Sequence, residues 1–184
     1  MRSVVFTFGR MNPPTRGHER LILKLLEVSR QHGSDHAVFL SQTQKSDKDP
    51  LNWAFKTRVC QAAFPGVNIS LDSAIKTPFQ ALQQLGEQYE QVIFIAGGDR
   101  VPEYQERMTP YAEKWGIKNF QIISAGDRNI QSRGIPGISS SKLREYALTG
   151  NSKKFLEGLP TRLNESLKEE IYQQTIFGLK KTDN

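Results

Sequence analysis

The sequence is poor in residues that build covalent and metal-based cross-links. It has one cysteine, Cys60, and three histidines among 184 residues. A single cysteine excludes an intrachain disulfide and a zinc site built on cysteine ligands, although metal binding by oxygen ligands stays open. Because a chain of this length buries enough surface to hold a core without disulfides, we expect one ordinary globular domain, with or without a terminal extension.

Long apolar runs are also missing. The opening segment has about five apolar residues before Gly9, too few for a signal-peptide core or a membrane span. No later run approaches the roughly 18 residues of a membrane helix. Hydrophobic residues make up 37% and charged residues 24%, which excludes a disordered or collagen-like polymer. The sequence therefore predicts a cytoplasmic protein with no membrane partner.

Positive charge is in modest excess and thinly spread. The chain carries 25 Lys and Arg against 19 Asp and Glu, a net charge of +6. The excess lies in residues 1–48 and 139–184, and no basic run is longer than the pairs at 153–154 and 180–181. Nucleic-acid-binding arms usually have longer basic blocks. The distribution favours small phosphorylated ligands over nucleic acid and makes an RNA-directed activity the weakest alternative.

Short apolar segments alternate with longer amphipathic ones. The pattern predicts five strands, over residues 3–8, 37–41, 67–71, 91–96 and 120–124. Helices are expected over residues 16–32, 51–64, 78–87, 103–114, 139–148 and 164–177. This alternation implies βαβ units with helices on both faces of a parallel sheet. The predicted fold class is α/β, a Rossmann-like, doubly wound, five-stranded parallel sheet with C-terminal helices. Its main domain is expected over residues 1–149, and residues 150–184 would be a helical extension packed on the same domain.

The segment after the first predicted strand combines a hydroxyl, an imidazole and a helix start. Residues 9–18 read GRMNPPTRGH, and the helix is expected to begin near Arg16. Gly9 would let a ligand approach the backbone closely. Thr15 and His18 share the first helical turn, where backbone N–H groups attract anions. A capping threonine beside a surface histidine explains the same spacing equally well.

A second polar segment, residues 137–144, reads GISSSKLR and leads into a helix. Lys142 and Arg144 lie near its first turn, where cations are unfavourable unless a polyanion binds there. Arginine can hold phosphate oxygens through two hydrogen bonds. Alone, the segment is explained better by a serine cap with solvated charges.

A third polar segment follows the predicted strand 91–96. Gly97 and Gly98 open the backbone, Asp99 could accept from a sugar hydroxyl or help to hold a metal, and Arg100 could meet a phosphate. An ordinary turn is an equal alternative. Because ligands of open α/β sheets bind beyond the carboxyl ends of the strands, we expect the three segments to share one site.

These motifs resemble those of the nucleotidyltransferase α/β phosphodiesterase superfamily. Residues 15–18 resemble its (H/T)xGH motif, residues 138–144 resemble ISSTxxR, and Gly98-Asp99 stands where related adenylyltransferases have a Gly-x-Asp turn. The resemblance spans residues 3–149. Thr15 replaces the first histidine of HxGH and Ser141 replaces the threonine of ISST. Several stretches are also similar to phage-encoded cytidylyltransferase-like proteins, and residues 9–13 to the opening of archaeal-type nicotinamide mononucleotide adenylyltransferases.

The resemblance implies a Mg²⁺-dependent transfer of a nucleoside monophosphate from a nucleoside triphosphate to a phosphorylated small molecule, with release of pyrophosphate. Phosphates would hold the ion, with no direct side-chain ligand. His18, Thr15 and Arg144 are the implied catalytic residues. The implied nucleotide-binding residues are Gly9, Arg10, Asn12, Gly17, Gly97, Asp99, Arg100, Ile138, Ser139, Ser140 and Ser141. Acceptor-binding candidates are Gln42, Lys45, Arg58 and Arg128.

Three questions stay open at this stage. ATP with nicotinamide mononucleotide is slightly favoured, and CTP with a phospho-alcohol is the alternative. A nucleotide-binding or virion structural protein without turnover is a rival from another class. The oligomeric state and the role of residues 150–184 cannot be read from the sequence, and a phage-encoded chain would act in the host cytoplasm.

Overall fold

The computed structural model describes residues 1–45, 47–126 and 137–181, which group into two compact units. The first unit contains Met1–Gly9, Arg20–Phe39 and, as far as it is described, Val67–Asn129. The second contains Arg10–Glu19, Leu40–Gly66 and, as far as it is described, Ile130–Asn184. The predicted division of the chain at residue 149 stays a prediction.

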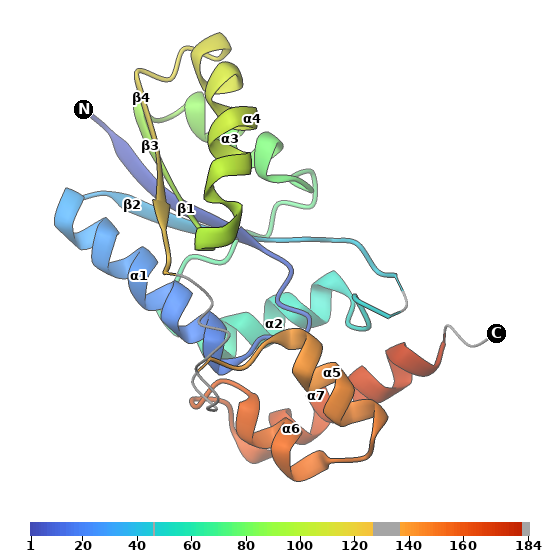
Figure 1. Ribbon diagram of the computed structural model, residues 1–184. Helices are drawn as coiled ribbons and strands as arrows, with labels where there is room; N and C mark the ends of the chain where they lie inside the picture. Colours follow the sequence, from blue (N-terminus) through green and yellow to red (C-terminus); the bar gives the residue numbers. More distant parts are fainter. Residues whose placement is uncertain (46, 127–136, 182–184) are drawn as a thin grey trace. The chain divides into compact units, whose positions relative to one another are not determined.

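The first unit is built on a parallel sheet of four strands (Figure 1). In chain order these are β1 (Ser3–Gly9), β2 (Asp35–Leu40), β3 (Gln91–Ala96) and β4 (Asn119–Ser124), and in the sheet they lie in the order β2-β1-β3-β4. β1 pairs with β3, with Phe6 opposite Phe94, and β3 pairs with β4. The expected Rossmann-like α/β fold with a parallel sheet and C-terminal helices is confirmed.

The prediction of a five-stranded sheet is wrong, because the third predicted strand, residues 67–71, is not a strand of the sheet. In the described chain this segment makes one bridge, between Val38 and Ile69. Two hydrogen bonds support it: Val38 N–H donates to the Asn68 carbonyl and Ser70 N–H donates to the Val38 carbonyl, each over 2.8 Å. Only Ile69 is buried, whereas Leu71 is 65% exposed. The segment therefore has too little buried surface to extend its pairing beyond one bridge.

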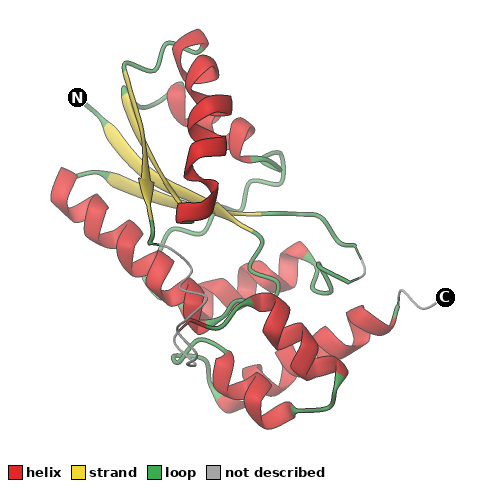
Figure 2. Ribbon diagram, viewed as in Figure 1, coloured by secondary structure: helices red, strands yellow, loops and turns green. Residues whose placement is uncertain are grey.

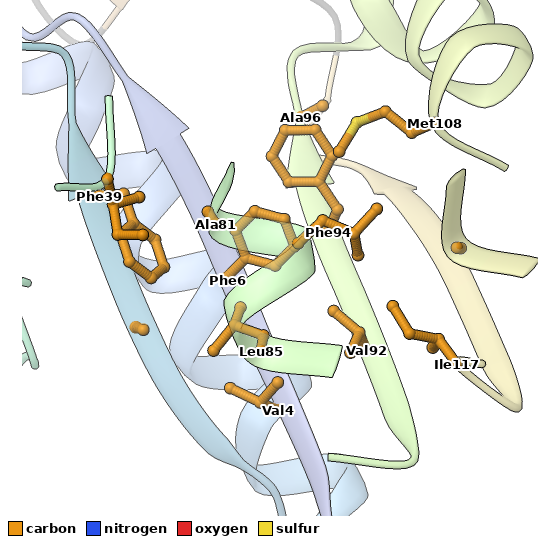
Figure 3. Packing of buried hydrophobic residues seen from close by; sticks show 14 residues of the cluster. Val4, Phe6, Phe39, Ala81, Leu85, Val92, Phe94, Ala96, Met108 and Ile117 are labelled. Atoms are coloured by element: carbon orange, nitrogen blue, oxygen red, sulfur yellow. The ribbon is translucent and has the colours of Figure 1, made fainter. Parts of the chain in front are cut away.

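Helices cover both faces of this sheet. α3 (Pro78–Gly86) and α4 (Val101–Lys114) lie on one side and α1 (Arg16–His32) on the other (Figure 2). Alternate strand residues point toward α3 and α4, as expected for a period of two. Phe6 and Phe94 stack there with ring centroids 4.6 Å apart (Figure 3). A short 3₁₀ helix (Gly98–Arg100), which the sequence did not predict, connects β3 to α4.

The second unit contains four helices in the part that the structure describes. They are α2 (Trp53–Ala63), α5 (Ser140–Leu148), α6 (Ser152–Gly158) and α7 (Glu165–Lys180). Each begins after an Asn or Ser whose side chain accepts a backbone N–H of the first turn, as N-caps do. α6 was not predicted, because seven residues are too few to show a helical period. Across the described residues, no helix is long and apolar enough to cross a membrane.

Candidate functional site

In the second unit the first turns of α1 and α5 are held side by side. The hydroxyl of Thr15, the residue before α1, accepts Gly17 N–H at 3.1 Å and donates to the Ile138 carbonyl at 2.8 Å. Ile138 directly precedes Ser139, the N-cap of α5. The Ser140 hydroxyl also donates to the Pro13 carbonyl, at 2.8 Å. Two positive helix ends therefore lie together, an arrangement that attracts anions.

Gly17 makes this close approach possible. A Cβ atom at position 17 would lie 2.8 Å from the Ile138 carbonyl oxygen, closer than real Cβ contacts come. The same atom would lie 3.3 Å from the Thr15 hydroxyl. Any larger residue would push the start of α5 away from the start of α1.

His18 is half-buried and its ring is fixed by the backbone one turn earlier. Thr15 N–H donates to His18 Nδ1 over 2.9 Å. Because Nδ1 accepts, the proton of the neutral imidazole resides on Nε2, which is then a donor. The geometry thus supplies a donor of fixed orientation at the start of α1.

The turn between β1 and α1 is tied to α5 through Asn12. Asn12 is fully buried and exchanges two hydrogen bonds of 2.9 Å with the backbone of Leu51. Its own carbonyl accepts from Arg144 Nη1 at 2.8 Å. Arg144 Nη2 donates in addition to the Ser141 hydroxyl, at 3.1 Å. Asn12 therefore fixes the position of this turn. The Arg144 side chain is buried, and its guanidinium is held by the Asn12 carbonyl and the Ser141 hydroxyl.

Positive charge is concentrated around this turn. Arg10 is close enough to both Lys56 and Arg144 to affect each of them electrostatically. Burial, and then the nearby Arg10, lower the pKa of Arg144 from its usual value. The buried Asp49 carboxylate lies 3.3 Å from Arg10 Nε. The carboxylates of Asp49 and Asp47 oppose the shift of Arg144, so three cations and two carboxylates lie around this turn, a positive surplus that suits a polyanion.

The serine and threonine hydroxyls expected on the phosphates have partners within the chain. Ser139 Oγ accepts Lys142 N–H, while Ser140 and Thr15 donate to the carbonyls described above. A hydroxyl has one proton to donate. Thr15 and Ser140 therefore position the two helix starts in this structure, and the direct contact with the nucleotide that the resemblance implies stays a prediction.

Four predicted residues belong to the first unit. Gly9 ends β1, and Gly97 follows β3, the strand that pairs with β1. Asp99 and Arg100 are exposed. Arg100 Nε lies 3.2 Å from Glu103 Oε2, and its guanidinium lies over the Tyr104 ring. Arg100 thus has partners on the first turn of α4.

The acceptor-binding candidates differ in burial and in the partners that the structure gives them. Gln42 is half-buried and Lys45 is exposed. Arg58 lies over the Phe55 ring and donates to Glu170 of α7 at 2.5 Å, so it links α2 to α7. Arg128 lies outside the described residues. Trp53, which could stack on a base or pack in a core, is half-buried.

The sequence did not predict that Lys56 and Asp49 belong to the charged groups around the site. Lys56 has no exposed surface and Asp49 is 4% exposed. A signal for Lys56 was present, because Val59, Cys60 and Ala63 continue its helical face at spacings of three, four and seven, and all are buried. A charged residue on a buried helix face requires partners, and it was overlooked because charged side chains are usually exposed.

The residues of the described ranges show no group of three or more His, Cys, Asp or Glu that could hold a metal ion. The backbone N–H groups at the starts of α1 and α5 and the nearby Arg10 and Arg144 can pair with phosphate oxygens, while the acidic side chain of the first turn of α1, Glu19, accepts two hydrogen bonds from Thr161. This donor set fits a metal ion that arrives on a polyphosphate.

No protein-family model matches the chain, and no curated protein matches its sequence. Its fold is similar to that of a bifunctional NMN adenylyltransferase/ADP ribose pyrophosphatase from Francisella tularensis, with a TM-score of 0.58 and 12% identity over 96% of this chain and 53% of that one. A structure of the Francisella enzyme with AMP and a manganese ion gives a TM-score of 0.54 and 15% identity over 96% and 52%. This chain thus spans about half the length of the Francisella enzyme.

A further similar structure is a nicotinic acid mononucleotide adenylyltransferase from Plasmodium falciparum, complexed with NaAD. Its TM-score is 0.51 at 14% identity, over 100% of this chain and 97% of that one. At such identities the similarity shows the fold alone. The chain has the Rossmann-like α/β fold found in these adenylyltransferases.

Proposed function

We propose that this chain is a nucleotidyltransferase. It transfers a nucleoside monophosphate, AMP in the first place, from a nucleoside triphosphate to a phosphorylated small molecule such as nicotinamide mononucleotide. The observation that carries the proposal is the pairing of the α1 and α5 starts, with His18, Arg10 and Arg144 gathered around them. The fold similarity to NMN and nicotinic acid mononucleotide adenylyltransferases supports the choice of ATP.

The proposed reaction is a displacement at the α-phosphorus. A phosphate oxygen of the acceptor forms the new bond, the bond to the bridging oxygen breaks, and pyrophosphate leaves. Such chemistry depends mainly on alignment and charge stabilisation. His18 Nε2–H would donate to an α-phosphate oxygen as negative charge increases there, a contribution of the kind that typically changes rates by about 10²- to 10³-fold.

The remaining phosphates would be bound by helix amides and cations. The N–H groups at the start of α5 and the guanidinium groups of Arg10 and Arg144 are suited to the β- and γ-phosphates. Thr15 and Ser140 would position these groups through their bonds to Ile138 and Pro13. No covalent enzyme intermediate is required.

Magnesium is expected to enter as the complex with the nucleotide. The buried Asp49 carboxylate lies beside Arg10, and the carboxylates of Asp49 and Asp47 both act on Arg144, so each already has a cation nearby. The ion would therefore be held by phosphate oxygens and water. Bound in this way, magnesium reduces the negative charge on the leaving pyrophosphate.

A pyrophosphate-release screen tests the proposal. Four nucleoside triphosphates are crossed with nicotinamide mononucleotide, nicotinate mononucleotide, phosphopantetheine, glycerol 3-phosphate and ribitol 5-phosphate, each with Mg²⁺. We expect ATP with one mononucleotide to give a signal that His18→Ala reduces by about 10²- to 10³-fold. His32→Ala, on the exposed last turn of α1, is the matched control and should leave the rate unchanged.

Two results would contradict the proposal. Binding of nucleotide without pyrophosphate release for any acceptor would favour a binding protein without turnover. Activity that survives His18→Ala would remove His18 from the reaction. A signal with CTP and a phospho-alcohol would keep the reaction class and change the substrate.

A further inference from the structure

Lys56 is a fully buried lysine whose ammonium joins two separate stretches of backbone. It lies on α2 with no exposed surface. Its Nζ donates to the Arg10 carbonyl at 2.6 Å, to the Ser41 carbonyl at 2.8 Å and to the Ser41 hydroxyl at 3.2 Å. An ammonium has three protons, so each acceptor matches one.

This arrangement fixes Arg10 from two directions. Lys56 holds the carbonyl of Arg10, and the buried Asp49 carboxylate lies 3.3 Å from its Nε. The Arg10 side chain is nevertheless 53% exposed, so its guanidinium is accessible to a ligand. The next residues of the chain are Met11, at a φ of 45°, and Asn12, whose carbonyl binds Arg144.

We propose that Lys56 is the positioning residue of the phosphate site, because it sets the backbone from which Arg10 reaches the triphosphate. The inference rests on the proposed nucleotide site and adds a residue that touches neither substrate nor reacting atoms. A neutral apolar side chain would leave the two carbonyls and the hydroxyl, all partly buried, without this donor. The backbone of this turn would then change conformation, and the Arg10 guanidinium would no longer be positioned to bind the triphosphate.

The charges around Lys56 explain why its three hydrogen bonds matter for ligand binding and not only for folding. Lys56 adds a third cation to Arg10 and Arg144, with Asp49 as their buried counter-ion. Like charges held together repel one another until an anion joins them. A bound triphosphate therefore gains from the rigid placement of all three cations.

The test compares Lys56→Met with Lys56→Arg in the full chain. Thr57→Val is the matched control, since Thr57 is the next residue of α2, is buried, and uses its hydroxyl only on the Trp53 carbonyl among the described contacts. The dissociation constant of Mg·ATP is measured by calorimetry beside the urea midpoint. We expect Lys56→Met to weaken binding by about 10- to 100-fold. Lys56→Arg should recover much of the affinity, and Thr57→Val should leave it unchanged.

A double-mutant cycle with Arg10→Ala separates positioning from general support of the fold. If Lys56 acts through Arg10, Lys56→Met should have little further effect on Mg·ATP affinity in the Arg10→Ala background. Additive losses, or a folded Lys56→Met variant that binds Mg·ATP like the wild type, would overturn the proposal. Should Lys56→Met fail to fold, Lys56→Gln, which keeps two N–H donors, takes its place in the same comparisons.

These readouts do not depend on turnover. If the wild type binds Mg·ATP and releases no pyrophosphate, the proposed reaction fails while the role of Lys56 is still tested. If the wild type binds Mg·CTP instead of Mg·ATP, the same variants are compared with Mg·CTP, and if it binds neither, both proposals are overturned together.

Discussion

The backbone N–H of Thr15 donates to Nδ1 of His18 over 2.9 Å. The residue that precedes α1 therefore sets the ring of the histidine one turn later. The Thr15 hydroxyl at the same time holds the Ile138 carbonyl at the start of α5. One residue thus places both the imidazole and the neighbouring helix end.

Two amide substitutions at position 18 should separate the two ring nitrogens. The short side-chain amide of His18→Asn can reach toward Thr15 N–H, as Nδ1 does, whereas the longer side chain of His18→Gln can place an N–H near the position of Nε2. We expect His18→Gln to retain more pyrophosphate release than His18→Asn, because the proposed phosphate donor is Nε2–H. Equal losses in both variants, with folding intact, would argue against that assignment.

Gly17→Ala should destabilise the second unit. The new methyl group would lie 2.8 Å from the Ile138 carbonyl oxygen, and backbone atoms cannot move aside cheaply. We expect a loss of about 1–3 kcal/mol in the free energy of unfolding, measured by urea titration. Gly97→Ala is the control, since among the described residues its methyl group would meet only the flexible Asp99 side chain, at 3.0 Å. Equal stability of the two variants would contradict the close approach.

Above neutral pH, the affinity for nucleotide should depend on the protonation state of Lys56. Burial lowers its pKa to about 8, an effect to which Arg10 adds and which Cys60 and Asp49 oppose. Above that pH the native amine has lost one proton and can satisfy two acceptors instead of three. We expect Mg·ATP affinity to fall as the pH rises through about 8.

Stability should change in the opposite direction over the same range. Between pH 8 and the usual lysine value of 10.5, the unfolded chain binds the proton that the native chain has released. The Lys56 contribution to the free energy of unfolding therefore rises with pH in this window. Lys56→Arg, which does not titrate there, should lose both effects. A wild type and variant with the same pH profiles would contradict the assignment.

His36 should make the first unit sensitive to acid. Burial lowers its pKa below 6.5, with the nearby Asp35 opposing the shift, and its Nε2 accepts Asn68 N–H at 3.2 Å. The unfolded chain therefore binds a proton more readily, so the His36 contribution is present above pH 6.5 and is lost as the pH falls through the native pKa. Urea titrations from pH 7.5 to 5 should show a smaller loss for His36→Gln than for the wild type. His32→Gln, at an exposed position, should leave the loss unchanged.

Local patterns in the sequence were enough to find most of the fold. The apolar segment around Phe94 identified β3, and the serine before α5 identified a helix start, because each signal lies within a few residues. The prediction for residues 67–71 was wrong because alternation of apolar and polar residues indicates an extended backbone. It does not say how many residues of that segment pair with a neighbouring strand. Pairing depends on the neighbouring edge, which the local sequence does not contain.

The candidate site was also predictable where the signal is local and not where it depends on distant residues. Thr15, His18 and Arg144 were identified by their motifs, and the structure places all three in the second unit. The partners of Thr15 and Arg144 could not be predicted, because Ile138 and Asn12 are 123 and 132 residues away from them. Lys56 and Asp49 were missed because only tertiary structure shows that their charges are buried.

The second unit is assembled from stretches near the beginning, the middle and the end of the described sequence. During synthesis Asn12 emerges from the ribosome 132 residues before Arg144, the side chain that binds its carbonyl. Contacts between such distant residues close late. A nascent chain that stops before Ile138 has the Thr15–His18 turn but lacks the Ile138 carbonyl and the Arg144 guanidinium. The proposed nucleotide site is therefore among the last parts of the molecule to form, after the strands of the sheet have already been translated.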